Sequence, residues 1–377
     1  MLKLTKTISL ILALSIFALA PAFAQHGHEQ EQEHASQSHE ENTHAEESFN
    51  AGEYVLEHVS DSYDWHIVSW GDHHISIPLP VILYSKNPEL HGEKSFHVFM
   101  SSKFHHAHDD YKGFRISGSK EFSGKIVEVD TQGHELGRPI DISVTKTIVE
   151  AIISVIFLVW ILGYVASKAK RNTGKAPSGI QNLLEPIIVF VRDEVAKPAI
   201  GEKKYEKFMP FLLTVFFFIL LNNFIGLIPI PPFGANVTGN IAVTMVLALF
   251  TFAITTINGN RHYWKEIYNP DVPWWLKFPI PLMPIVELSG LITKPFVLMV
   301  RLFANMMAGH MIVSVFVSLI FIFASIMGPA AGFGISPVSV AFSVFILLLD
   351  VLVSFIQAYV FTLLSALYFG MATAEHH

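Results

Sequence analysis

The sequence predicts an all-α polytopic membrane protein with about five membrane-embedded helices, the last two long and tilted, and one interfacial helix. A signal peptide and a small β-rich extracytoplasmic region are expected to precede these helices. Of the 377 residues, 51% are hydrophobic and only 15% are charged, and the mean hydropathy is +0.44. This composition is too apolar for an ordinary pair of soluble domains. Long apolar runs from about residue 147 onward contain most of the hydrophobic residues that raise the mean hydropathy.

The composition also excludes several classes of protein. The chain contains no cysteine, which rules out disulfides, thiolate metal sites and cysteine nucleophiles. Its net charge of −7 is unevenly distributed, because acidic residues and histidines crowd the first part while lysines and arginines flank the later apolar runs. Nucleic-acid binding therefore has no support.

Residues 1–24 have the features of a cleavable signal peptide. A basic start with Lys3 and Lys6 precedes an apolar core, and the small residues Ala22 and Ala24 flank Phe23 just before the expected cleavage point. An uncleaved anchor is the alternative, although the apolar core is shorter than the ~20 residues that span a bilayer. Both interpretations put the following segment outside the cytoplasm.

Residues 25–50 are expected to form a disordered segment rich in histidine and glutamate. They lack the apolar side chains that would offset the entropy cost of ordering the backbone. A solvated tail is the favoured interpretation, and weak metal binding or pH sensing by its histidines is the alternative. These histidines are His26, His28, His34, His39 and His44.

Residues 51–142 are expected to form the β-rich extracytoplasmic region. Short alternating stretches at 75–77, 97–99 and 126–129 are separated by glycine, proline and asparagine turn signals. A cluster within residues 105–109 offers candidate metal ligands, but it lacks the paired spacing of a structural zinc site, so no metal is expected. The members of this cluster are His105, His106, His108 and Asp109.

The membrane domain is expected over residues 143–377, and its first span over 148–166. A basic stretch containing Lys168, Lys170 and Arg171 follows this span. Positive charge beside a span marks the cytoplasmic side. The signal peptide independently puts the other end of the same helix outside, so two unrelated features predict one orientation.

The remaining apolar runs complete the predicted topology. The charge-interrupted stretch 181–197 is typical of a helix that lies at the cytoplasmic interface. The runs 208–228 and 240–257 form a membrane hairpin around a proline-rich turn. The segments 281–327 and 336–371 are each far longer than the ~20 residues of a perpendicular span, so they are expected to tilt strongly or break. This order leaves the C-terminus in the cytoplasm.

A charged stripe within the segment 281–327 is the main candidate functional site. Arg301 lies deep in an apolar run, where a charge costs at least about 2.5 to 3.5 kcal/mol. At about 100° per residue, Glu287, Lys294, Arg301 and Asn305 fall within ~40° of one another on a helix. The stripe is therefore expected to face a partner or a water path. The alternative is an arginine paired with a neighbouring carboxylate for packing alone.

A second set of polar residues accompanies the stripe. His310 lies about 180° around the helix from Arg301 and so is expected to look away from the stripe. On the final helix, Asp350, Ser354 and Gln357 share one face. An intramembrane histidine with an aspartate available favours a proton relay over simple packing.

No phosphate-binding loop, activated nucleophile or metalloprotease pair occurs in the sequence. The spans also contain few side chains able to do covalent chemistry. The chain is therefore expected to conduct an ion, with no ATP site and no cofactor of its own.

The membrane part resembles subunit a of the F-type ATP synthases from about residue 147 to residue 372. The resemblance is carried by four ordered motifs. They are Asn223-Phe-Ile-Gly-Leu-Ile-Pro229, Thr238-Gly-Asn-Ile-Ala-Val-Thr244, Lys294-Pro295 leading to Arg301-Leu-Phe-Ala-Asn305 and Ala308-Gly309, and Gln357-Ala-Tyr-Val-Phe361. The resemblance implies a bacterial inner-membrane protein whose partners are the ring of c subunits, the peripheral-stalk b subunits, membrane lipid and the translocated H⁺.

The resemblance also implies roles for particular residues. Arg301 would face the membrane-buried carboxylates of the rotating ring and bar direct proton flow between two half-channels. Asn305, His310, Asp350 and Gln357 would line or adjoin the outer half-channel, and Glu287 the cytoplasmic exit. Many relatives carry the acid and the imidazole of the pair His310 and Asp350 at exchanged positions, so contact between the two is a hypothesis.

Some questions stay open at the level of the sequence. Residues 25–142 lie outside the resemblance, and Ala304 replaces a glycine common in relatives. A divalent metal-ion transporter with a histidine-rich tail is the rival function, and a structural receptor or anchor is a third. A cation such as Arg301 on the main polar stripe would repel a divalent ion, which disfavours the first rival. The coupling ion is H⁺ by default, with Na⁺ as the alternative.

Overall fold

The computed structural model describes residues 61–374 apart from the short stretches 71–72, 86, 88–95, 105–109, 120–121, 123, 131, 173–175, 229–235 and 269–281. The predicted signal peptide, the histidine-rich segment 25–50 and the cluster at 105–109 therefore lie outside the described residues. Within the described part, a strand-rich region comes first and a long helical region follows.

The strand-rich region contains three small antiparallel sheets. The first sheet pairs β1 (Asp64–Trp70) with β2 (His73–Pro78). The strands of the second sheet lie in the order β4 (Phe96–Met100), β3 (Pro80–Tyr84) and β8 (Ile140–Asp141). Those of the third lie in the order β5 (Phe114–Ile116), β6 (Ile126–Val129) and β7 (Glu135–Gly137). Each of the alternating stretches at 75–77, 97–99 and 126–129 lies in one of these strands. Apolar side chains from the second and third sheets share one small core, which contains Val81, Leu83, Phe99, Phe104 and Phe114.

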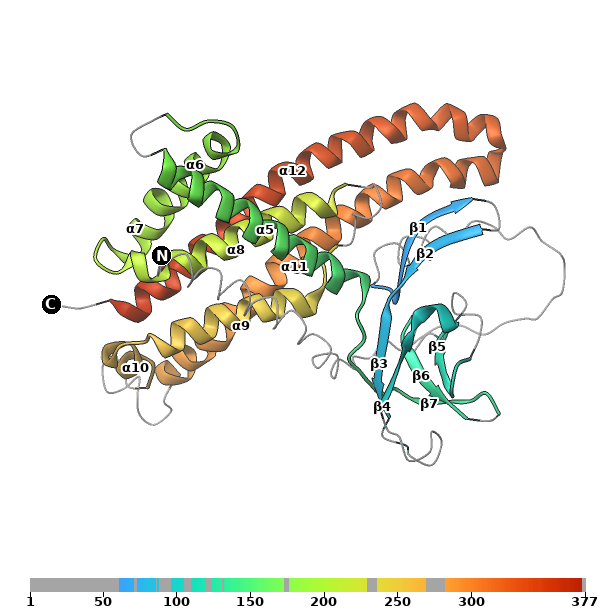
Figure 1. Cartoon of the computed structure of the whole chain (residues 1–377), viewed down its shortest axis with the longest axis horizontal. Coiled ribbons are helices and arrows are strands. Elements are labelled where there is room, and N and C mark those ends of the chain that lie inside the picture. The colour runs from blue at the N-terminus through green and yellow to red at the C-terminus, as the bar shows by residue number, and fades with distance from the viewer. Residues whose placement is uncertain are drawn as a thin grey trace.

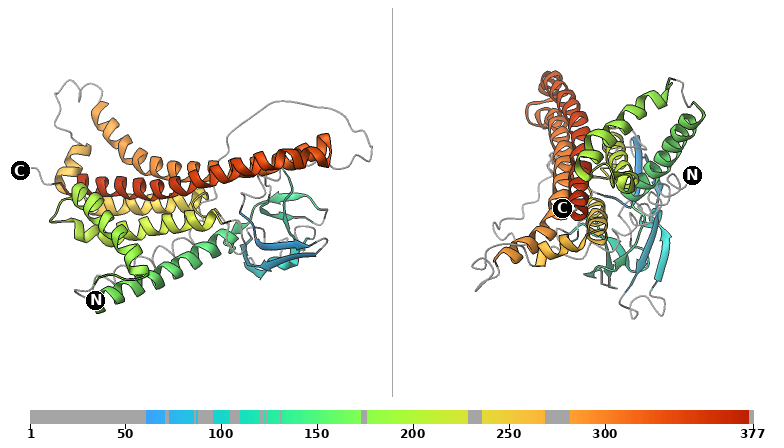
Figure 2. Two further views of the ribbon diagram at one scale, coloured as in Figure 1. Left: turned by 90° about the horizontal axis from the view of Figure 1, so that it is seen from above. Right: turned by 90° about the vertical axis from the view of Figure 1, so that its left-hand side faces the viewer.

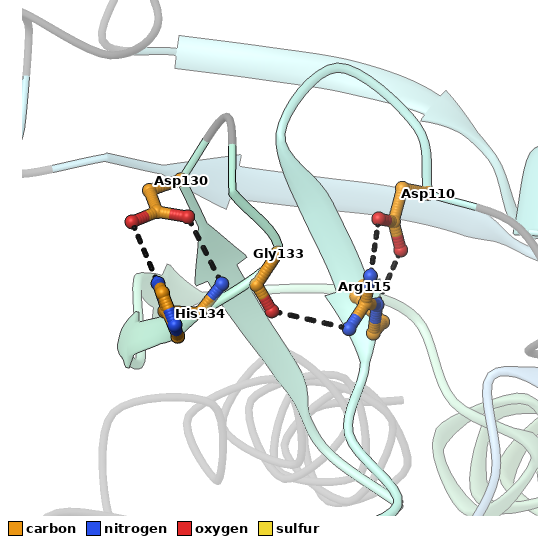
Figure 3. Close-up of polar contacts among 5 residues, drawn as sticks. All are labelled: Asp110, Arg115, Asp130, Gly133 and His134. Atoms are coloured by element: carbon orange, nitrogen blue, oxygen red, sulfur yellow. Dashed lines mark hydrogen bonds and ion pairs between the residues drawn. The ribbon is translucent and has the colours of Figure 1, made fainter.

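Two polar clusters fasten the turns of the third sheet (Figure 3). Arg115 donates from Nε and Nη2 to the two carboxylate oxygens of Asp110, at 2.5 Å each, and from Nη1 to the carbonyl oxygen of Gly133 at 3.4 Å. These bonds hold the pKa of Asp110 below its ordinary value. The backbone N–H of His134 donates to Asp130 at 2.9 Å and is the main cause of the lowered pKa of Asp130. The clusters tie β5 to the turn between β6 and β7.

The helical region consists of nine consecutive segments in the described residues. They are α5 (Lys146–Arg171), α6 (Ile180–Phe190), the π-helical η2 (Val191–Ala196), α7 (Lys197–Ile200), α8 (Tyr205–Gly226), α9 (Ile241–Ile257), α10 (Arg261–Tyr268), α11 (Leu282–Met327) and α12 (Pro329–Thr373). Among the described helices, α5, α8, α11 and α12 are long and apolar enough to cross a membrane, and α9 with α10, bent by 106°, is a fifth candidate. The predicted polytopic helical class is confirmed.

The expected interfacial helix at 181–197 is a chain of three helical segments, α6, η2 and α7. Pro198 has no N–H, so the carbonyl of Glu194 loses its usual i→i−4 partner. The N–H of Lys197 donates to the carbonyl of Arg192, five residues back, which is the spacing of a π-helix. Among the described residues, none of these three segments is both long enough and apolar enough to span a membrane.

The last helix is longer than the sequence suggested, whereas α11 has nearly the expected bounds. The last helix was expected from residue 336, but α12 begins at Pro329, because proline is favoured at the first helical position and only Gly328, with a φ of 91°, separates α12 from α11. Each helix has an axial length of about 68 Å, at 1.5 Å per residue, against about 30 Å of hydrocarbon. Each helix must therefore tilt strongly, bend or extend beyond the hydrocarbon layer. Figure 2 shows that α11 curves along its length, and Pro295 lies within this helix.

The end of α12 is fixed by contacts from three other segments. Lys204 Nζ donates to the carbonyl of Thr373 at 2.7 Å, and the N–H of Asn260 donates to the carbonyl of Ala372 at 2.8 Å. A Cβ added at Gly370 would lie 1.9 Å from the carbonyl oxygen of Ala199, so only glycine allows α7 to approach this closely. Figure 1 shows the strand-rich region at the opposite end of the bundle, where α5 begins.

Candidate functional site

The middle of α11 has one face buried in the protein and one face open. Leu298, Leu302 and Met306 recur at four-residue spacing and are at most 3% exposed. Leu298 and Leu302 pack into the core to which α8 and α12 also contribute. The open face carries Arg301, Ala304, Asn305 and Ala308, all of which are exposed. The small alanines leave room for a partner helix to approach the guanidinium.

The charge of Arg301 is not neutralised within the described part of the chain. No ion pair or hydrogen bond there reaches its guanidinium group. The structure therefore does not support the alternative that Arg301 pairs with a neighbouring carboxylate for packing alone. An uncompensated cation inside an apolar helix requires a partner from another molecule or from water.

The part of the stripe near the start of α11 lies closer to other helices. Glu287 and Lys294 are half-buried. Lys294 Nζ lies 5.7 Å from the centre of the Tyr368 ring, within the range of a cation–π contact. Lys294 and Tyr368 also line a cavity of about 20 Å³ between α9, α10, α11 and α12. The stripe thus passes from a packed region at Lys294 to an open one at Arg301.

Asp350 on α12 packs directly against the backbone of α11. A Cβ built at Gly309 would lie 2.8 Å from Asp350 Oδ1 and 2.9 Å from Oδ2, so the carboxyl group occupies the space that glycine leaves. Asp350 Oδ2 is buried and has no hydrogen-bond partner among the described residues. His310, the next residue on α11, is half-buried at the same level. The two helices thus bring the candidate acid to the residue beside the candidate imidazole.

Gln357 occupies the buried face of α12 together with Ser354 and Ala358. Its side chain is 5% exposed, and Ser354, which is fully buried, donates to the carbonyl of Asp350 at 2.7 Å. No hydrogen bond among the described residues joins Gln357 to Arg301. The face shared by Asp350, Ser354 and Gln357 therefore turns inward, whereas Arg301 and Asn305 turn outward.

Sequence reasoning did not identify a buried polar cluster that joins α8, the segment before α9, and α11. Thr238 Oγ1 donates to Asn223 Oδ1 at 2.6 Å, and both residues are fully buried. Asn236 Nδ2 donates to the carbonyl of Met306 at 3.4 Å, one residue beyond Asn305. The adjacent asparagines Asn222 and Asn223, inside an apolar run, are the sequence signal that could have indicated this cluster.

The fold and the site together define a polytopic helical membrane protein with an unneutralised charge in a spanning helix. A model of the ATP synthase A chain family matches residues 148–370. The chain belongs to this family. A second model, that of a domain of unknown function (DUF8433), matches residues 54–144.

Curated relatives agree with this assignment. ATP synthase subunit a of Chloroherpeton thalassium is 46% identical over 242 residues, which are 62% of this chain and 68% of the relative. ATP synthase subunit a 2 of Chlorobaculum tepidum is 45% identical, with 62% and 64% covered. ATP synthase subunit a of Myxococcus xanthus is 43% identical, with 63% and 75% covered. The matched stretch spans about two thirds of the length of these relatives.

Gly309→Ala tests whether the position of the Asp350 carboxyl group matters. The new methyl group would meet both carboxylate oxygens at less than 3 Å, so the carboxyl group must swing away from α11. We expect the complex to assemble normally. ATP-driven proton pumping should fall at least about fivefold, which corresponds to the loss of one polar interaction with the free energy of a typical hydrogen bond. The measurement is acidification of inverted membrane vesicles. Gly334→Ala on α12 is the control, since nothing lies within 4 Å of its added Cβ. Equal pumping by the two variants would contradict the expectation.

Proposed function

We propose that this chain is the stationary proton-translocating subunit of the F0 sector of a rotary ATP synthase, in the inner membrane of a bacterium. Its partners in this proposal are the c-subunit ring, the peripheral-stalk b subunits and membrane lipid. Membership of the ATP synthase A chain family supports this role. The observation that carries the proposal most directly is Arg301, exposed on the open face of α11 without a counter-charge among the described residues.

The arginine acts by electrostatics in this proposal. A ring carboxylate that has lost its proton cannot remain unpaired in a low-dielectric layer, because an isolated ion there costs several kcal/mol. Arg301⁺ offsets that charge while the carboxylate passes. The same cation blocks protons from passing directly between the two sides of the membrane. Protons must then bind to the ring and travel with it, which couples their flow to rotation.

Two half-channels supply and remove the protons. Asn305, His310, Asp350 and Gln357 line or adjoin the outer half-channel, and Glu287 belongs to the path to the cytoplasm. The contact of Asp350 with Gly309 supports a path between α11 and α12, because it leaves a carboxylate oxygen buried without a hydrogen-bond partner in the described structure. Such a group costs free energy unless water or a proton satisfies it, and a proton path would supply either one.

The remaining organisation follows from the topology. Residues 1–24 act as a signal peptide, 25–50 as a solvated histidine-rich segment, 51–142 as an extracytoplasmic region and 143–377 as the proton-channel domain. The C-terminus then lies in the cytoplasm. Basic residues at the end of α5, Lys168, Lys170 and Arg171, support this orientation. The rival function, a divalent metal-ion transporter, receives no support from the family or the relatives.

Arg301→Ala tests the proposed function. Removing the cation leaves the ring carboxylate without its counter-charge, so we expect ATP-driven proton pumping to fall at least about 70-fold, the factor that ~2.5 kcal/mol represents. The measurement uses the whole complex in vesicles. Arg192→Ala is the matched control, since Arg192 lies outside the spans and pairs with Asp193. Pumping that survives in Arg301→Ala would rule out the proposal.

Exchange of the candidate relay pair tests whether His310 and Asp350 act together. His310→Ala and Asp350→Ala are each expected to lower pumping at least about 100-fold, since a positioned proton-transfer group contributes a factor of about 10² or more. His310→Glu combined with Asp350→His preserves one acid and one imidazole, so it should pump better than either single exchange. Initial rates of vesicle acidification decide between the outcomes. A double exchange no better than its halves would argue against contact.

A further inference from the structure

The carboxylate of Asp61 joins the strand-rich region to two helices of the membrane domain. Asp61 Oδ1 accepts from the N–H of Thr147, in the first turn of α5, at 3.3 Å. Its other oxygen, Oδ2, accepts from Asn240 Nδ2 at 3.5 Å. Asn240 is the N-cap of α9, and its Oδ1 accepts from the N–H of Ala242 at 3.0 Å. A negative charge therefore lies beside the N-terminal ends of both helices, where the helix dipole favours it.

The next three residues fix the position of Asp61 by hydrogen bonds to α5 and to the strand-rich region. The carbonyl of Ser62 accepts from the N–H of Lys146 at 3.1 Å. Tyr63 is buried and donates from its hydroxyl group to Asp141 on β8. Asp64 accepts from the hydroxyl of Ser101, which also accepts from the N–H of Leu79 at 2.9 Å. Asp61 is thus carried by a segment anchored in two sheets.

The segment 236–240 continues the connection from Asp61 to α11. Asn236 Oδ1 accepts from the N–H of Gly239 at 2.8 Å, and Asn236 Nδ2 donates to the carbonyl of Met306 at 3.4 Å. A Cβ at Gly239 would lie 2.0 Å from Asn236 Nδ2, so a larger residue here would displace the Asn236 side chain. Thr238 is held by its bond to Asn223 on α8. The segment contacts α11 one residue beyond Asn305 and three residues before Gly309.

We propose that Asp61 is a positioning residue for proton translocation, through which the region before α5 holds segment 236–240 against α11. This inference rests on the proposed function. It assigns a role to the strand-rich region, which lies outside the part of the chain that matches the ATP synthase A chain family, residues 148–370. Asp61 lies outside the proton path itself, and it acts by fixing Asn240, and with it Asn236, against Met306 of α11, the residue next to Asn305.

A reversal of one hydrogen bond tests the proposal. Asp61→Asn replaces Oδ2 by an N–H₂ group that faces the amide of Asn240, so two donors oppose each other. Asn240→Asp alone puts two carboxylates together. In the double variant, Asn at position 61 donates to Asp at position 240, while its Oδ1 still accepts from Thr147 and the aspartate still caps α9. We expect each single variant to lower proton pumping about fivefold, and the double variant to return to within about twofold of wild type.

The measurement uses the whole complex in inverted vesicles, with the amount of assembled complex quantified by immunoblot. Asp110→Asn is the matched control, because it removes a carboxylate from the same region, where Asp110 pairs only with Arg115 among the described residues. We expect this control to pump like wild type. A double variant no better than the worse single variant would overturn the proposal, and so would single variants that pump normally.

Arg301→Ala, measured in the same vesicles, separates the two proposals. If Arg301→Ala abolishes pumping while Asp61→Asn does not change it, the positioning role fails and the proposed function stands. If Arg301→Ala pumps normally, the proposed function itself fails.

The rescue distinguishes positioning from folding. A variant that merely unfolds the strand-rich region would not recover when the partner residue is changed. A second readout uses the absence of cysteine from the natural chain. Val237→Cys, at a fully buried position in segment 236–240, should react with a water-soluble maleimide about fivefold faster when Asp61→Asn is added. Leu247→Cys, fully buried in α9, should react no faster, and faster reaction at both positions would indicate general unfolding and overturn the positioning role.

Discussion

One positive charge lies on the open face of a long apolar helix, and the described chain supplies no negative charge to neutralise it. That constraint explains why α11 is organised as it is. Leu298, Leu302 and Met306 anchor one side of the helix in the core, so that Arg301 is held facing outward. Ala304 and Ala308 have small side chains, so another helix can pack closely against the outward face. A positive charge exposed in this way is stabilised in a membrane only when a partner brings the opposite charge beside it.

The other helices hold this face in a fixed place. α8 contributes much of the buried core, and α12 runs beside α11 with Asp350 lodged against Gly309. Lys204 and Asn260 donate hydrogen bonds to the last carbonyls of α12 and so attach its end to the segments before α8 and α10. At the other end, Asp61 and segment 236–240 connect the strand-rich region to α9 and α11. Both ends of the site are thus restrained while its middle stays open.

Much of this architecture could be predicted from the sequence, because apolar runs and buried charges are local signals. The spacing of Arg301 and Asn305 was enough to predict one shared face of a helix. The start of α12 was misplaced by seven residues, since the last helix was expected from residue 336 and in the structure it begins at Pro329 and continues through Pro337. The lodging of Asp350 against Gly309 depends on how two helices pack, which no local pattern specifies. Asp61 and Asn240 are 179 residues apart, so their contact had no sequence signal at all.

The central claim is that the open face of α11 around Arg301 meets the c-subunit ring. Because the natural chain has no cysteine, Ala304→Cys and Ala308→Cys can each be paired with a cysteine on the carboxylate-bearing helix of the c subunit and tested for disulfide cross-linking in native membranes. Cross-links should form from positions 304 and 308 and should be absent from Leu302→Cys, which points into the core. Cross-links from position 302 alone, or from none of the three, would contradict the orientation on which the proposed mechanism depends.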